Sequence, residues 1–466
     1  MFLTLHRFVL AGCLTAAVGC NVGEVRDPGD DDRGGDADGG PVVPGPDAAP
    51  TDLQFAGIYS VGANGDALTA SWTAALGTGA IEYTLFVTTV DDSPVTEVST
   101  SDTTAVASGL PDGEYKLRVD ASDSLGRHDD GGVVLTQLIG TNRVVKRSRV
   151  PLAGAADVWG EGNIIVVAGQ SSGISAMVVD VTDVNNPQVI SEIDNEGYVK
   201  DPKIGDGLLF LNDEGGTYGG RIFDFTDPAN PVRLSRIGSP ITSVHNIFYE
   251  KSHLYMTDNS SGGIRIVDTS DPENPTLVHT WYPPSSSVHD QIVVGGKMYA
   301  AWWSGFSITD VTDPSNPEDL VVHYYGGFAS NCHSIWPTED GKHVLTTDET
   351  GGGHIRVFDV ADPDNVSQIA EYITDPSHIV HNVHIRGDYA FIAYYVDGLR
   401  VLDISNPAEP VEVGFWDEET GSGMSGTWGV WPFGEHVAVS SMKFGLIMVD
   451  FFPPTVTADG PWGVSH

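Results

Sequence analysis

The sequence predicts an all-β protein in which a seven-bladed β-propeller follows a small β-sandwich. Seven segments end in an apolar strand followed by an aspartate, and successive aspartates lie 42 to 49 residues apart. A repeat of that length, built only from short strands and turns, is typical of propeller blades. Upstream of the repeats, residues 53–138 alternate apolar and polar side chains over several short stretches. This period of two predicts a small sandwich of antiparallel strands.

The length and charge of the chain limit its organisation and its partners. The 466 residues are enough for more than one core. The 23 basic and 64 acidic side chains give a formal charge of -41. A charge of this sign repels polyphosphates and anionic bilayers. Nucleic acid is therefore not an expected partner.

The first residues have the layout of an export signal. An apolar stretch runs from Phe8 to Val18, follows a short basic region and ends just before Cys20. The stretch is too short to cross a bilayer as a helix, so residues 1–19 are expected to be a cleaved signal peptide. The small residues before Cys20 resemble a bacterial lipobox. That resemblance implies acylation of Cys20 and a lipid-anchored protein of the bacterial envelope, at the outer membrane or cell surface; an ordinary secretory signal without lipid is the alternative.

A tether and a first domain are expected to follow the signal. Residues 20–51 are rich in Asp, Gly and Pro, which predicts a disordered acidic tether. Residues 52–139 form the predicted sandwich. Within it, GLPDGEYKLRVDASDSLG from Gly109 resembles the penultimate strand of a fibronectin type III domain, and Trp72 occupies the place of that family's early core tryptophan. The resemblance implies a spacer or adhesive module.

The turns after the repeat aspartates share one pattern. Six of them read DVTDVNNP, DFTDPANP, DTSDPENP, DVTDPSNP, DVADPDNV and DISNPAEP. Asp and Ser or Thr side chains bond back to nearby backbone N–H groups, and proline fixes φ, so the string predicts a tight reversal between two strands. Calcium binding by these acidic turns is the alternative to this structural role.

The ends of the repeat region predict how the ring closes. The seventh unit lacks an outer strand, because FFPPTVTADG follows Asp450. An unassigned strand, NRVVKRSRVPLAG, begins at Asn142, ahead of the first complete unit. We expect residues 143–150 to pair with the seventh blade, which removes the free sheet edges. The propeller then spans residues 142–453, and residues 454–466 form a C-terminal tail.

The repeats resemble the LVIVD-repeat propellers of bacterial and archaeal surface proteins. The segments that carry this resemblance are GIRIVDTSDPENP from Gly263 and GLRVLDISNPAEP from Gly398, with weaker copies in the other units. The resemblance implies a propeller fold over residues 142–453. It also implies a surface-exposed binding or adhesion role.

Four histidines recur at one position of the repeat, in SVHNIFYE, SVHDQIVV, NCHSIWPT and IVHNVHIR. The equivalent positions of the seven units hold Ala156, Lys200, His245, His289, His333, His381 and Trp428. This position opens the innermost strand, so the imidazoles are expected at one mouth of the channel. Acidic residues of glycine-rich loops are expected on the same face, namely Asp213, Asp258, Asp348 and Asp397.

Two chemical interpretations of the histidines stay open. Neutral imidazole suits zinc, copper, iron and nickel, so histidines and carboxylates at a funnel predict a divalent transition metal. Alternatively, the histidines are copied by repetition because each satisfies the same backbone carbonyl in each blade. His384 has the opposite strand parity to His381 and is expected to pack between blades.

The favoured function is a lipid-anchored surface protein whose propeller binds a protein or glycan on its polar funnel face. The residues expected to bind this ligand are Lys200, Asp213, Asp258, Asp290 and Trp428. The membrane is expected to be contacted only through the lipid anchor. The alternative is a metal-dependent oxidoreductase or hydrolase centred on His245, His289, His333 and His381. No Ser-His-Asp order, phosphate loop or HExxH helix is visible, so no catalytic residue is assigned.

Overall fold

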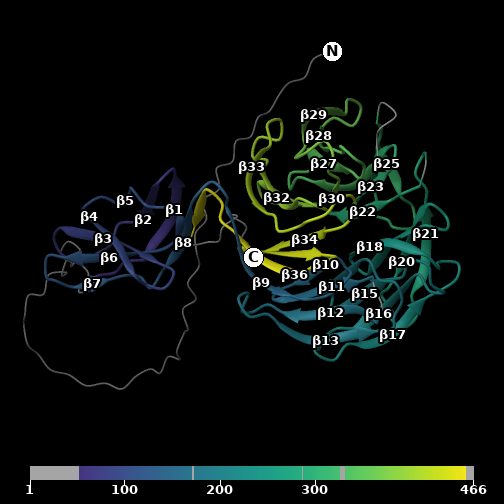
Figure 1. Ribbon diagram of the computed structural model, residues 1–466, viewed down its shortest axis with the longest axis horizontal. Helices are drawn as coiled ribbons and strands as arrows, with labels where there is room; N and C mark the ends of the chain where they lie inside the picture. Colours follow the sequence, from purple (N-terminus) through teal and green to yellow (C-terminus); the bar gives the residue numbers. More distant parts are fainter. Residues whose placement is uncertain (1–51, 171–172, 286, 326–330, 458–466) are drawn as a thin grey trace, which may run out of the picture. The chain divides into compact units, whose positions relative to one another are not determined.

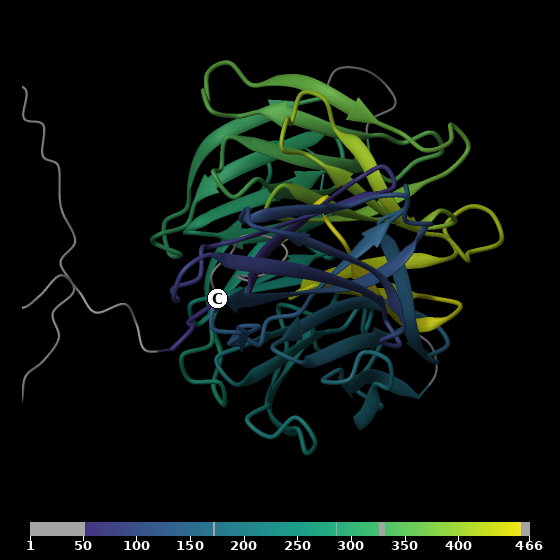
Figure 2. The same cartoon turned by 90° about the vertical axis from the view of Figure 1, so that its left-hand side faces the viewer.

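A computed structural model describes residues 52–170, 173–285, 287–325 and 331–457. Over these residues the chain consists of strands and the loops between them, as both views show (Figure 1, Figure 2). None of the described residues form a helix that is long and apolar enough to cross a membrane. The prediction of an all-β protein is confirmed. The predicted signal peptide, Cys20 and the tether lie outside the described residues.

Two sheets near the start of the described chain form a β-sandwich. One sheet has the order β37-β1-β2-β5, and in the other β4-β3-β6-β7 is joined by β8, which pairs with β6. The strands are β1 (Ile58–Asn64), β2 (Ala67–Trp72), β3 (Ile81–Thr89), β4 (Pro94–Thr100), β5 (Thr104–Ala107), β6 (Gly113–Asp123), β7 (His128–Asp129), β8 (Leu135–Ile139) and β37 (Thr455–Thr457).

The sandwich core follows from the alternation of apolar residues along these strands. Along β6 every second residue is buried, including Tyr115, Leu117 and Val119. The ring of Trp72 packs 5.4 Å from that of Tyr83. The hydroxyl of Tyr115 donates to the Pro111 carbonyl oxygen at 2.8 Å, which ties the end of the preceding loop to the strand.

Seven further four-stranded sheets, here called repeat sheets 1 to 7, lie between Val144 and Phe451. Sheets 1 and 2 are β10 (Ala155–Glu161), β11 (Ile164–Gly169), β12 (Ile174–Asp180) and β13 (Gln188–Asp194), then β14 (Pro202–Gly205), β15 (Leu208–Asn212), β16 (Gly220–Asp224) and β17 (Val232–Ile237). Sheets 3 and 4 are β18 (Val244–Glu250), β19 (His253–Asp258), β20 (Gly263–Asp268) and β21 (Thr276–Trp281), then β22 (Asp290–Val294), β23 (Lys297–Trp302), β24 (Gly305–Asp310) and β25 (Glu318–Tyr324).

The remaining repeat sheets have the same strand order. Sheets 5 and 6 are β26 (Cys332–Pro337), β27 (His343–Asp348), β28 (Ile355–Asp359) and β29 (Ser367–Tyr372), then β30 (Val380–Arg386), β31 (Tyr389–Tyr394), β32 (Gly398–Asp403) and β33 (Val411–Trp416). Sheet 7 is β34 (Thr427–Phe433), β35 (His436–Ser441), β36 (Gly445–Phe451) and β9 (Val144–Val150).

Strand β9 supplies the outer strand of sheet 7. It runs antiparallel to β36, with Val150 opposite Leu446 and Val144 opposite Phe451. The first strands of the seven repeat sheets, here called inner strands, contact one another in sequence order, and β34 contacts β10 (Figure 1). The inner strands therefore form a closed ring, and side chains from all seven sheets meet at its centre.

The turns after the third strands have the structural role that their sequences suggest. In six repeat sheets the carboxylate of the repeat aspartate accepts a hydrogen bond from the backbone N–H two residues later, as Asp180 does from Thr182 at 2.8 Å. The seventh aspartate, Asp450, lies in a different sequence and instead pairs with Arg147 and His436. These hydrogen bonds hold the reversal between the third and fourth strands.

The segment after Phe451 differs from the expected tail. Residues Thr455–Thr457 form β37, which pairs with β1 of the sandwich. The side-chain amide of Gln137, which is fully buried, donates to the Pro453 carbonyl oxygen at 3.1 Å. The end of the described chain is therefore part of a sheet, because β1 offers it a free edge.

Candidate functional site

The four repeated histidines, here called the hub histidines, lie at the start of the inner strands. Register shifts occur at this point in β18, β26 and β30, between Val244 and Ile247, Cys332 and Ser334, and Val380 and Val383. A bulge inserts an unpaired residue and re-aims the side chains around it. His245, His333 and His381 lie in these bulges, and His289 directly precedes β22.

The four histidines form one contiguous row of imidazole rings. The ring centroids are 4.4 Å apart for His245 and His289, 3.9 Å for His289 and His333, and 4.4 Å for His333 and His381. The row continues to Trp428, whose ring lies 4.5 Å from that of His381. The Lys200 ammonium lies 5.4 Å from the Trp428 ring. The structure therefore brings together six of the seven residues that the repeat alignment placed at equivalent positions.

Two glutamates complete the row, and the sequence analysis did not identify either of them. The Glu349 carboxylate has one oxygen 3.6 Å from His333 Nε2 and the other 4.0 Å from His381 Nε2. The hydroxyl of Tyr395 donates to Glu349 Oε1 at 2.6 Å, which orients the carboxylate. The sequence contained a signal for these glutamates. Glu349 directly follows Asp348, the aspartate after a second strand, and the same Asp-Glu pair recurs in sheet 2.

Glu214 belongs to that second pair. It accepts a hydrogen bond from His245 Nδ1 at 2.7 Å and forms an ion pair with Lys200 at 2.6 Å. Burial raises the pKa of this carboxyl group, but the hydrogen bonds from His245 and Lys200 outweigh that effect and lower it to about 2. Glu214 therefore stays a carboxylate near neutral pH and holds one nitrogen of His245.

Burial keeps the other three imidazoles neutral. Loss of water and repulsion from neighbouring rings hold the pKa of His289 and of His333 well below 6.5. Burial also lowers the pKa of His381 to about 3, although its hydrogen bond to the Trp428 backbone opposes the shift. Burial raises the pKa of Glu349. Three neutral imidazoles at this position are ready to act as donors to a metal.

These shifts predict a pH dependence of stability. In the unfolded chain His333 takes up a proton near pH 6.5, but in the folded protein it does not, so its contribution to stability falls as the pH drops below that value. The raised pKa values of Asp157, about 8, and Asp290, about 6, act in the opposite direction. The pH dependence of the parent is therefore a sum of opposing contributions, and only a variant at position 333 isolates that of His333.

We expect metal-free His333→Gln to lose stability less steeply than the parent on acidification, by about 1.4 kcal/mol per pH unit between about pH 6 and pH 5. Urea unfolding at several pH values measures this difference. Trp428→Phe, which exchanges one non-titrating side chain for another, is the control and should keep the slope of the parent. Equal slopes for His333→Gln and the parent would show that the folded protein protonates His333.

The hydrogen bonding of the histidines separates the two interpretations. His381 Nδ1 donates to the Trp428 carbonyl oxygen at 2.5 Å, which is the backbone role that the structural interpretation expects. The backbone of the next repeat also lies near His289 and His333 and slightly opposes their pKa shifts. However, His289 Nδ1 and both ring nitrogens of His333 are buried without a hydrogen-bond partner. Buried polar atoms without partners are costly, so repetition of a backbone contact does not account for the whole row.

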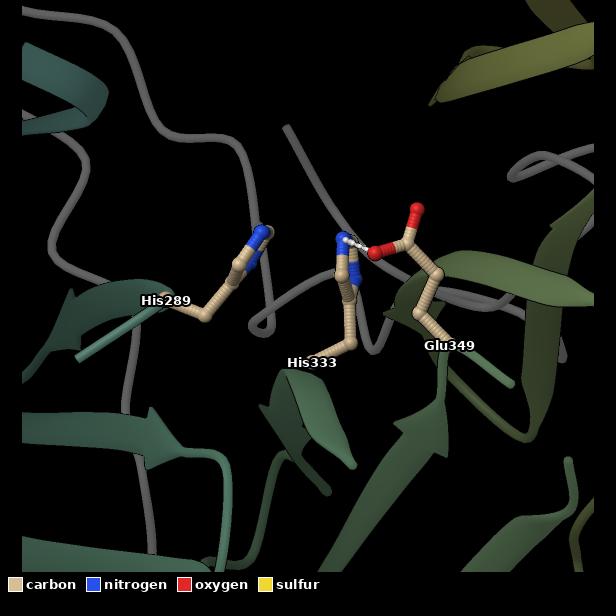
Figure 3. A group of neighbouring side chains, drawn as sticks. All are labelled: His289, His333 and Glu349. Carbon is tan, nitrogen blue, oxygen red and sulfur yellow. Dashed lines mark ion pairs between the residues drawn. The ribbon is translucent and has the colours of Figure 1, made fainter. Parts of the chain in front are cut away.

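Three of these side chains have the chemistry of a metal centre. One ligand atom each from His289, His333 and Glu349 lies within 4.8 Å of the other two. Figure 3 shows the two imidazoles side by side, with the Glu349 carboxylate next to His333. Two imidazoles and one carboxylate suit zinc or iron. This set is the single candidate metal group among the described residues.

The acidic residues expected at the mouth have another role. Asp213, Asp258 and Asp348 are each at least 98% buried, and each pairs with an arginine of the third strand at 2.9, 2.8 and 2.7 Å. Asp397 likewise lies 3.8 Å from Arg400. Asp213 and Asp258, which the sequence placed among the ligand-binding residues, are thus engaged by side chains of their own sheets. Their carboxylates are enclosed and neutralised by arginine, because the second and third strands of a sheet are direct neighbours.

Asp290 lines a cavity of about 40 Å³, together with the residues that directly follow the other three histidines. The cavity is lined from all seven inner strands, so it lies at the centre of the ring. Asp157 and Asp201 line it as well, and Lys203 forms an ion pair with Asp201. Asn246 Nδ2 donates to the Asp290 carboxylate at 2.6 Å, so this carboxylate is held by the inner strand of the preceding sheet.

His384 also lines this cavity, which corrects the expected position between blades. The expectation counted strand parity from His381, but the bulge between Val380 and Val383 adds a residue and reverses it. The His384 ring stacks on Trp336 at 3.8 Å and lies 5.0 Å from Trp431. Aromatic rings from three adjacent sheets therefore pack together at this cavity.

Comparisons with known proteins agree with this architecture. A sequence profile of the LVIVD repeat matches residues 252–281, 287–324 and 379–418. The β-propeller domain of Cps50 (Swd1) from Myceliophteria thermophila is similar in structure, with a TM-score of 0.52 and 11% sequence identity over 66% of this chain and 99% of that chain. The computationally designed Ika8 protein has a TM-score of 0.47 and 12% identity, covering 67% of this chain and all of that chain. No curated protein matches the chain.

The class of protein follows from the ring of repeat sheets, the LVIVD-repeat match and the likeness to the Cps50 propeller domain. The chain forms a β-propeller. It carries LVIVD repeats, as the sequence predicted. The structural likeness concerns the fold alone, since the sequence identity is 11%.

Proposed function

We propose that this protein binds a divalent transition metal at the mouth of a seven-bladed propeller. The observation that carries the proposal is the pair of adjacent imidazoles, His289 and His333, with three buried nitrogens that lack hydrogen-bond partners beside the carboxylate of Glu349. A metal would take one nitrogen from each of the two imidazoles, in the neutral form of the ring. His289, His333 and Glu349 would hold it.

Neighbouring groups orient these ligands. Tyr395 holds one oxygen of Glu349, and the Trp428 carbonyl holds Nδ1 of His381. Such outer contacts fix the ring tautomer and the carboxylate position around a metal. A bound divalent ion acts as a Lewis acid and lowers the pKa of its bound water. The metal-dependent oxidoreductase or hydrolase that the sequence suggested therefore rests on the same centre.

Metal analysis of the full chain tests this proposal. The protein is produced without an affinity tag, because a histidine tag binds the same ions. We expect about one equivalent of a transition metal per chain after dialysis, and restored occupancy when the chelated protein is reloaded with zinc or iron. The same chain with two substitutions, His289→Ala and His333→Ala, is the matched control. Less than about one tenth of an equivalent in the parent after reloading would refute the proposal.

A surface role for the propeller is a second proposal. Tyr198 and Tyr218 are 43% and 38% exposed, and their rings lie within 6 Å of the cationic groups of Lys200 and Arg221 respectively. Exposed aromatic rings beside cations favour recognition of a glycan or a protein. We propose that the chain is exported and lipid-anchored at Cys20, with the fibronectin-like sandwich as spacer. Palmitate labelling of Cys20 and a glycan array with the folded chain check these two points.

A further inference from the structure

We infer that the hub centre keeps open coordination positions for a small exogenous ligand, and that Trp303 limits the size of that ligand. This inference rests on the proposed metal binding. It adds that the metal contacts a molecule from solution, rather than only stabilising the fold.

The first step is the number of donors. Three side chains, His289, His333 and Glu349, place a ligand atom within the common distance. Structural zinc sites use four protein ligands, whereas catalytic sites use three and leave a position for water or substrate. Non-heme iron sites with two histidines and one carboxylate are open in the same way. Three donors therefore indicate an open centre.

The second step excludes one nitrogen on each flanking histidine as a further ligand. His245 Nδ1 is engaged by Glu214 at 2.7 Å, and His381 Nδ1 by the Trp428 carbonyl at 2.5 Å. The Nε2 atoms remain available: His381 Nε2 lies 4.0 Å from Glu349 Oε1, and the His245 ring lies 4.4 Å from that of His289. Coordination by either Nε2 would give a closed four-ligand site, which is the alternative that the experiment has to exclude.

The third step is access from solution. His333 is 1% exposed, whereas His289 and Glu349 are both partly exposed. The centre is therefore buried on the side of His333 and reachable on the side of the other two ligands. An exogenous molecule would approach past the residues that border His289.

Trp303 borders His289 at this point. Its ring centroid lies 4.7 Å from that of His289, and its side chain is partly exposed. Its backbone has φ 23°, in the region that a bulky residue rarely adopts. A hydrogen bond from Cys332 N to the Trp303 carbonyl oxygen, 2.9 Å long, ties this loop to the strand that carries His333.

Such backbone outliers persist where the surrounding structure holds them, and they cluster at ligand sites. The strained loop places an indole against the accessible ligand of the centre. A large flat ring at this place admits small molecules to the metal and blocks wide ones. Trp303 is thus a specificity-determining residue rather than a metal ligand.

The experiment uses the full chain loaded with cobalt(II), whose visible spectrum reports coordination. Azide is the small probe and 4-phenylimidazole is the wide probe. We expect azide to change the cobalt spectrum of the parent, and 4-phenylimidazole to leave it unchanged. Trp303→Ala should respond to both probes. Tyr324→Ala, which removes a 53% exposed ring from β25, is the matched control and should respond like the parent.

Trp303→Phe is measured beside the alanine variant, so that a loss of folding in the latter does not decide the result. It should respond to 4-phenylimidazole more weakly than Trp303→Ala and more strongly than the parent. A parent protein that takes up one cobalt but shows no response to azide would overturn the inference and indicate a closed site, while metal binding itself would stand. Failure to take up cobalt would overturn both. Equal responses of the parent and both Trp303 variants to 4-phenylimidazole would remove the role of Trp303.

Discussion

Replacing His333 with leucine is expected to abolish tight metal binding and to make the metal-free protein more stable. His333 is 1% exposed, and neither of its nitrogens has a hydrogen-bond partner. Loss of an outer contact of a metal ligand already costs about 10- to 100-fold in affinity, so loss of the ligand itself should cost more than about 100-fold. Leucine also removes the penalty of an unpartnered buried polar group, which is about 1–3 kcal/mol.

The two effects are measured separately. Competition with a chromophoric chelator gives the metal affinity, and urea unfolding in the presence of chelator gives the free energy of unfolding of the metal-free protein. His343→Leu, in the next strand of the same repeat sheet, is the matched control and should leave the affinity unchanged. If His333→Leu keeps the metal, the proposed ligand set is wrong. If His333→Leu lowers the free energy of unfolding of the metal-free protein, His333 stabilises the fold although its nitrogens lack hydrogen-bond partners.

Replacing Asp258 with alanine is expected to destabilise the protein by about 3 kcal/mol, because a buried ion pair that loses one partner leaves the other charge uncompensated. The Asp258 carboxylate is fully buried and accepts hydrogen bonds from Arg265 Nε at 2.8 Å and from the Ser260 backbone at 3.1 Å. The same change should not alter the metal content of the folded protein, since Asp258 is not part of the metal group.

Urea unfolding and metal analysis of the same samples test both parts. Asp364→Ala, at an exposed position of a turn, is the control and should change the free energy of unfolding by less than about 0.5 kcal/mol. An Asp258→Ala protein of parental stability that has lost its metal would instead show that Asp258 contributes to the metal site. An Asp258→Ala protein that is destabilised but keeps its metal supports a structural role for Asp258.

The regular part of the molecule could be predicted because it depends on local patterns. Alternation along β6 predicted which of its residues are buried, and the shared Asp-Ser/Thr turn predicted the reversals after the third strands. Repetition added information that single strands lack, because the missing outer strand after Asp450 pointed to the unpaired strand before the first repeat. These features need only neighbouring residues and a constant repeat length.

The site could be predicted only in part. The shared register of four histidines predicted that they meet, because equivalent positions of the repeat lie at equivalent places of the ring. Three details were not predicted. The bulge in β30 reversed the parity of His384, and third-strand arginines enclosed the aspartates expected at the mouth. The strand that carries His333 and the loop that carries Glu349 came together beside His289 of the preceding sheet.

The sequence by itself determined the strands, the turns, the repeat and the residues at the start of each inner strand, since short-range hydrogen bonding and side-chain alternation specify them. Only the tertiary structure decided which of those residues face one another and which atoms remain unsatisfied. The physical reason is that the histidine row joins side chains of different repeat sheets. Whether the nitrogens of His333 have partners depends on its contacts with His289 and His381, which lie in the two neighbouring repeats and come close to it only when the sheets pack against one another.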